Sequence, residues 1–165
     1  MSPTAEGQTK RPRLSSPAHE PSSTHPKIDA KLRSIYPFEI IEALELEYQE
    51  RTQNQQSTSE DSNPTILKFV YQVIHEERWI YSEHETRTCG IYGKLDDANE
   101  QVLKVFEKGH GDFIDEVNCI NEEGAPRVEN TMSWWIDENG CLSLGALDGG
   151  DGDEFEVYVA RLPLL

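Results

Sequence analysis

The stretch that decides the fold is TMSWWIDENGCLSLGA, residues 131–146. Two apolar runs, 131–136 and 141–146, flank the turn sequence Asp-Glu-Asn-Gly. An Asn-Gly pair between short apolar runs is a strong β-hairpin signal, because both residues tolerate the positive φ angles of tight turns. We therefore expect two antiparallel strands joined by this turn.

Three further segments have the composition of strands. Residues 67–75 are rich in β-branched and aromatic side chains, and residues 85–92 read as the returning strand of a wide hairpin. In residues 155–161 apolar and polar side chains alternate, so one face should be buried. The acidic, glycine-rich residues 148–153 before this last strand predict a turn.

Two segments have the spacing of amphipathic helices. Residues 95–108 carry apolar side chains at three- and four-residue steps, and Gly109 is placed to end that helix in a left-handed conformation. The other predicted helix spans residues 35–51. Its apolar stripe includes Phe38, Ile41, Leu44 and Tyr48.

The order of these elements predicts an α+β fold. We expect a single small domain with a mainly antiparallel sheet of about five strands, one or two packed helices and a disordered N-terminal tail. All three tryptophans and four of the five phenylalanines lie in the final hundred residues. The predicted units are a Ser/Pro-rich tail (1–34), an amphipathic helix (35–51), a flexible polar linker (52–65) and an α+β domain (66–165).

Three segments also carry a resemblance to known proteins: FVYQVIH (69–75), GIYGKLDDA (90–98) and WWIDENG (134–140). Together they form a strand, a Gly-aromatic strand end that leads into a helix, and a terminal meander. On this pattern residues 66–163 resemble a group of small uncharacterised fungal α+β proteins. The resemblance implies fold and lineage, and it transfers no activity, cofactor or catalytic residue.

The charge of the chain is divided between its ends. Residues 1–35 carry a net charge of +3, residues 36–65 carry −6 and residues 66–165 carry −13, for a total of −16. Such asymmetry indicates different partners for the head and the body. An acidic body favours basic protein partners and repels nucleic acid.

The basic head contains the element Lys10-Arg11-Pro12-Arg13. Short basic patterns in extended segments are read by importin-type receptors, so Lys10, Arg11 and Arg13 predict nuclear import. Three charges neutralise few phosphates, and we expect no direct nucleic-acid binding. No run approaches the ~20 apolar residues of a membrane span, so we expect no membrane partner. The predicted location is the nucleus or the cytoplasm.

Two features are candidates for contact with a protein partner. One is the helix stripe of Phe38, Ile41, Leu44 and Tyr48, which can fold back on its own sheet or enter a partner's groove. Folding back is favoured, because a tethered helix has a high effective concentration. The other candidate is the pair Trp134 and Trp135, which should face opposite sides of a strand. One of the two can therefore be exposed for recognition, or can be covered by a helix.

No catalytic, metal or cofactor site is assigned from the sequence. Nucleophile elbows, phosphate loops and dinucleotide fingerprints are absent, the acidic turn fails the EF-hand pattern, and the three cysteines have no zinc-site spacing. His75 and His84 could approach one another across a hairpin among glutamates, but loop histidines of this kind are usually solvated.

These patterns predict a non-enzymatic acidic interaction or regulatory protein. One alternative is a small enzyme or ligand-binding domain with a pocket between sheet and helix, built on polar groups such as His75 and Arg87. Another is an acidic mimic of nucleic acid.

Overall fold

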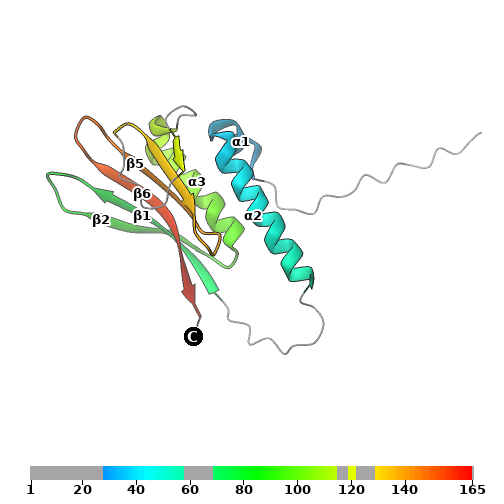
Figure 1. Ribbon diagram of the computed structural model, residues 1–165. Helices are drawn as coiled ribbons and strands as arrows, with labels where there is room; N and C mark the ends of the chain where they lie inside the picture. The colour runs from blue at the N-terminus through cyan, green and yellow to red at the C-terminus, as the bar shows by residue number, and fades with distance from the viewer. Residues whose placement is uncertain (1–27, 58–68, 115–118, 122–128, 165) are drawn as a thin grey trace, which may run out of the picture.

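A computed structural model describes residues 28–57, 69–114, 119–121 and 129–164. It confirms the α+β class: the described helices lie on one face of a six-stranded sheet (Figure 1). None of these helices combines the length and the apolar composition that a bilayer crossing needs.

The sheet has the strand order β2-β1-β6-β5-β4-β3. Its strands are β1 (Phe69–Arg78), β2 (Glu85–Tyr92), β3 (Cys119–Asn121), β4 (Met132–Ile136), β5 (Leu142–Leu147) and β6 (Glu154–Pro163). Neighbouring strands are antiparallel except for the parallel pair β3 and β4. The last strand, β6, therefore lies between β1 and β5, in the middle of the sheet.

Both turns predicted from glycine-rich sequence are present. Gly140 has φ of +78°, and its N–H donates to the Asp137 carbonyl at 2.9 Å. In the acidic turn the Asp148 N–H donates to the Asp153 carbonyl at 2.8 Å. The Asp148 carboxylate accepts from the Gly150 N–H at 2.7 Å, so it closes the turn.

In the described part of the chain, three α-helices cover the inner face of the sheet: α1 (Ala30–Ile35), α2 (Phe38–Ser57) and α3 (Leu95–His110). The chain continues from α3 into a 3-10 turn, Gly111–Phe113. Gly109 was predicted to end α3 in a left-handed conformation. That prediction is wrong, since the helix includes Gly109 and its φ is not positive.

The described elements differ from the predicted units in three places. Helix α1 lies in the segment assigned to the disordered tail, and α2 runs six residues into the predicted linker, to Ser57. Strand β3 was not predicted. The rest of the tail (1–27) and of the linker (58–65) lies outside the described residues.

The core joins all layers of the fold. Side chains that are completely buried include Ile40 and Leu44 of α2, Leu103 and Phe106 of α3, and Val73, Leu144 and Val157 of the sheet. Asn99 of α3 is a completely buried polar residue of this core. Its side-chain amide donates to the Gly140 carbonyl at 2.8 Å and its oxygen accepts from the Leu142 N–H at 3.0 Å. Asn99 thereby fastens the β4–β5 hairpin to α3.

Candidate functional site

None of the described helices covers the outer face of the sheet (Figure 1). This face carries a groove. We call it the open-face groove, and its volume is about 390 Å³. Its lining residues are Glu76, Arg78, Trp135, Asp137, Cys141, Leu142, Ser143, Glu156, Tyr158 and Val159.

Strand register explains why a groove forms here. Ser143 of β5 lies directly between Trp135 of β4 and Tyr158 of β6. Neighbouring strands are about 4.8 Å apart, so the two aromatic residues stand on backbones roughly 10 Å apart with a small serine between them. Two large walls and a small floor make a slot.

Carboxylates lie at one end of this slot. Glu156 accepts a hydrogen bond from the Ser143 hydroxyl at 3.0 Å, and Glu76 accepts one from the Tyr158 hydroxyl at 2.8 Å. Arg78 lies 3.3 Å from Glu76 and 3.8 Å from Glu154, with its side chain 54% exposed. The protein's own guanidinium therefore already occupies the acidic end of the groove.

The hydrogen bond between Tyr158 and Glu76 affects both groups. Burial and the hydrogen bond to Glu76 raise the pKa of Tyr158 to about 12. Burial acts to raise the pKa of Glu76, but the bond from Tyr158 and the nearby His84 and Arg78 lower it below its ordinary value. Glu76 is thus a fixed negative charge and Tyr158 a fixed hydrogen-bond donor at neutral pH.

The two predicted tryptophans have different environments. Trp134 is buried in the core with 4% of its surface exposed, whereas Trp135 is only partly buried and lines the open-face groove. Adjacent residues of a strand point to opposite faces, which accounts for the difference. Of the pair, Trp135 is the one available for contact.

The predicted helix stripe is divided in the same way. Ile41, Leu44 and Tyr48 are each at most 3% exposed, because α2 packs against α3 and the sheet. In this arrangement they serve the core and are not free for a partner. Phe38 is 69% exposed and lies with Leu46 on the opposite side of α2, where with Glu42 they line a shallow hollow.

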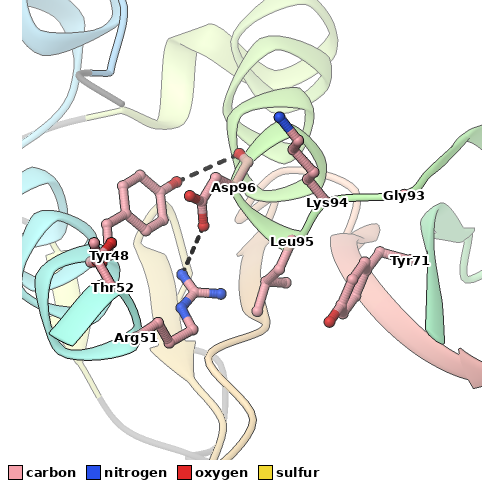
Figure 2. Close-up of a pocket in the computed structure, with 8 residues that line it drawn as sticks. All are labelled: Tyr48, Arg51, Thr52, Tyr71, Gly93, Lys94, Leu95 and Asp96. Atoms are coloured by element: carbon pink, nitrogen blue, oxygen red, sulfur yellow. Dashed lines mark hydrogen bonds and ion pairs between the residues drawn. The ribbon is translucent and has the colours of Figure 1, made fainter. Parts of the chain in front are cut away.

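A second cavity, of about 370 Å³, lies where α2 meets the start of α3 (Figure 2). Arg51 of α2 pairs with Asp96 of α3 at 2.9 Å, and the Tyr48 hydroxyl donates to the Asp96 carbonyl at 3.4 Å. Burial raises the pKa of the Tyr48 phenol. The ion pair between Arg51 and Asp96 therefore joins α2 to α3 across this cavity.

A cluster of polar side chains lies on the inner face of the sheet, around His75. His75 is 1% exposed, and its Nε2 lies 2.7 Å from Nε2 of His110 and 3.2 Å from Glu77. Its Nδ1 accepts from Arg87 Nε at 2.9 Å. His84, which the sequence indicated could approach His75, instead lies 3.4 Å from Glu76.

The histidines of this cluster are neutral. Burial, with the charge of Arg87, lowers the pKa of His75 to about 4. Burial, with His75 and Arg87, lowers the pKa of His110 to about 4. A neutral imidazole that accepts from Arg87 at Nδ1 carries its proton on Nε2, so that proton points toward His110 and Glu77.

The same geometry bears on metal binding. One donor atom each from His75, Glu77 and His110 lies within 4.8 Å of the others, which is close enough for one ion. A metal on His75 Nε2 would need a lone pair there, and metal-bound histidines usually donate their other N–H. Arg87 instead donates to His75 and places a positive charge beside it. The cluster is therefore built as a hydrogen-bond relay.

The sequence indicated that His75 could approach His84 and that both were solvated, whereas His75 is buried and its neighbour is His110. His110 is the last residue of α3, and only the packing of α3 on β1 brings it to His75. Val73, His75 and Glu77 occupy alternate positions of one strand and so point to the same face. This alternation was the feature of the sequence that could have predicted that His75 points inward. Lys10, Arg11 and Arg13 lie outside the described residues.

Comparisons with protein-family models, with curated proteins and with solved structures found no match to this chain.

Proposed function

We propose that the protein is a non-enzymatic interaction protein whose open-face groove binds a lysine- or arginine-containing segment of a protein partner. The observation that carries this proposal is the slot between Trp135 and Tyr158, which ends at Glu76 and Glu156. Aromatic walls suit the aliphatic stem of a long cationic side chain, and carboxylates suit its head.

Charge supports the choice of a basic partner. The groove carries three carboxylates, on Glu76, Asp137 and Glu156, against the single cation Arg78. The whole chain carries a net charge of −16, which would attract a basic protein over a distance and accelerate the encounter. The pairing of the Arg78 guanidinium with Glu76 supports a cationic side chain as the occupant.

Fluorescence anisotropy with a short labelled peptide of alternating lysine and serine tests the proposal. The wild-type protein should bind it, and the analogue with glutamine for lysine should not bind. Trp135→Ala should weaken binding by about tenfold, since a desolvated cation–π contact and stem packing are worth about 1–2 kcal/mol. Circular dichroism of the variant controls for folding.

Two charge variants separate the groove from general attraction. Glu156→Gln should weaken binding several-fold. Glu42→Gln makes the same charge change at an exposed position on α2 and should leave binding nearly unchanged. Arg78→Gln should strengthen binding, because it removes the competing cation. Equal effects of Glu156→Gln and Glu42→Gln, or full binding by Trp135→Ala, would sink the proposal.

We further propose that the basic element Lys10, Arg11 and Arg13 directs the protein to the nucleus through an importin-type receptor. Its support is the pattern of three cations around Pro12 in a Ser/Pro-rich segment, set against an acidic body. The chain should be fused to a fluorescent carrier too large to enter the nucleus by diffusion. Replacing the three cations with alanine should move the fusion to the cytoplasm, and unchanged nuclear fluorescence would contradict the assignment.

A further inference from the structure

A third cavity, of about 460 Å³, lies between β2 and α3, on the opposite side of the sheet from the open-face groove. We call it the β2–α3 pocket. Its walls hold Arg87 and Cys89 of β2 and Lys104, Lys108 and Gly109 of α3. Three of its described lining residues are cations and none is a carboxylate, in a chain with net charge −16.

Arg87 is held at this pocket by an unusual partner. Its Nε and Nη2 lie 2.9 and 2.6 Å from Nδ1 of buried His75. A carboxylate in that place would orient the guanidinium and also neutralise it. A neutral imidazole orients the guanidinium but does not neutralise its positive charge. The carboxylate that comes nearest to Arg87 in the described residues is Glu77, at 3.9 Å.

The lysines supply further positive charge from the helix side. Lys104 pairs with Glu100 of its own helix at 2.6 Å, and Lys108 lies one turn further on in the last turn of α3. The pocket floor reaches the histidine relay, because a Cβ placed on Gly109 would lie 3.9 Å from His75 Cε1. The relay thus positions one wall of the pocket.

We propose that the β2–α3 pocket binds a small metabolite through its phosphate group. A phosphate carries about −1.5 to −2 charges at neutral pH, which suits three converging cations better than one carboxylate does. Arginine binds phosphate oxygens in a fork and lysine binds them as a point charge. The volume lies in the range of small-molecule sites, roughly 300–1,000 Å³. This site does not depend on the groove proposed above.

Cys89 offers a direct readout, because its half-buried thiol lines the pocket and half-buried Cys119, on the distant strand β3, serves as a reference in the same molecule. The full chain is alkylated with neutral iodoacetamide, with and without inorganic pyrophosphate, at constant ionic strength. Mass spectrometry then follows each cysteine. Pyrophosphate should slow the reaction of Cys89 in a saturable way and leave that of Cys119 unchanged.

Variants assign the protection to the pocket. The double variant Lys104→Gln/Lys108→Gln should raise the half-protecting concentration by about tenfold, as loss of charge-assisted hydrogen bonds predicts. The matched control Lys94→Gln changes an exposed lysine at the opposite end of α3, outside the lining of the pocket, and should have no effect. Arg87→Gln should abolish protection, and the lysine variant keeps the test valid if Arg87→Gln disturbs the His75 relay.

A second reagent tests whether the electrostatic potential of the pocket is positive when no ligand is bound. Anionic iodoacetate should react with Cys89 faster, relative to iodoacetamide, than it does with Cys119. The double lysine variant should reduce this preference several-fold. Protection by sodium chloride alone, protection that survives the double variant, or no protection by pyrophosphate would overturn the proposal.

Discussion

His75 and His110 are neutral imidazoles inside the domain, and this makes stability depend on pH. In the folded protein both pKa values are about 4, below the ordinary value of 6.5. Between pH 4 and pH 6.5 the unfolded chain therefore binds more protons than the folded protein does. The neutral forms therefore stabilise the fold fully above pH 6.5, and this contribution is lost as the pH falls toward 4.

Urea unfolding at pH 7.5 and pH 5.5 measures this effect above the range where most carboxylates titrate. We expect a lower midpoint at pH 5.5, because each unit of pKa difference is worth about 1.4 kcal/mol when fully expressed. A His75→Gln/His110→Gln variant lacks the titrating groups and should show a smaller pH difference. An equal difference in the variant would contradict the assignment.

Asn99 is a buried polar residue that links α3 to the β4–β5 hairpin. It is completely buried and satisfies the Gly140 carbonyl and the Leu142 N–H. Asn99→Ala should lower the free energy of unfolding by about 2–4 kcal/mol, since it leaves two buried backbone groups without partners. The exposed substitution Gln49→Ala is the matched control, and urea unfolding is the measurement. A loss below that of the control would show that water replaces the amide.

At the scale of single elements, α3 contains a glycine that its conformation does not require. Gly109 is exposed, helical and has open space around its Cβ position, with only His75 Cε1 at 3.9 Å. Gly109→Ala should therefore raise the free energy of unfolding by about 0.5–1 kcal/mol. Thermal unfolding measures the gain. A loss of stability would mean that the Cβ displaces the ring of His75.

Elements with a local signal were predictable, and elements held by distant contacts were not. The β4–β5 hairpin is encoded by its Asn-Gly turn, and α3 by its apolar spacing. Helix α1 has only six residues and is held by Leu32 in the core and by the Tyr36 hydroxyl, which donates to the Leu103 carbonyl at 2.6 Å. So short a helix is unstable alone, and its sequence carries little signal.

The candidate sites show the same limit. Alternation predicted that Trp134 and Trp135 face opposite sides, but only the sheet order places Trp135 across Ser143 from Tyr158. Helix α2 was predicted from its buried stripe, and its second, exposed apolar side at Phe38 and Leu46 came from the structure. The positions of these residues relative to their neighbours depend on contacts distant in the chain, which periodicity does not report.

At the scale of the whole molecule, the net charge of −16 opposes compactness through self-repulsion. Salt screens such repulsion, and the Debye length shortens from about 30 Å at 0.01 M to about 10 Å at 0.1 M. The melting temperature should therefore rise by several degrees between these concentrations of sodium chloride. A fall would mean that surface pairs such as Lys104 with Glu100 outweigh the repulsion.

The position of β6 has a consequence for how the protein is made. It is the last described strand to leave the ribosome, yet it joins β1 to β5 in the middle of the sheet. Until residues 154–163 emerge, β1 and β5 each have an edge without the partner strand that β6 supplies. Unpaired strand edges promote aggregation. A chain cut short by a premature stop codon before residue 154 would lose the centre of its sheet.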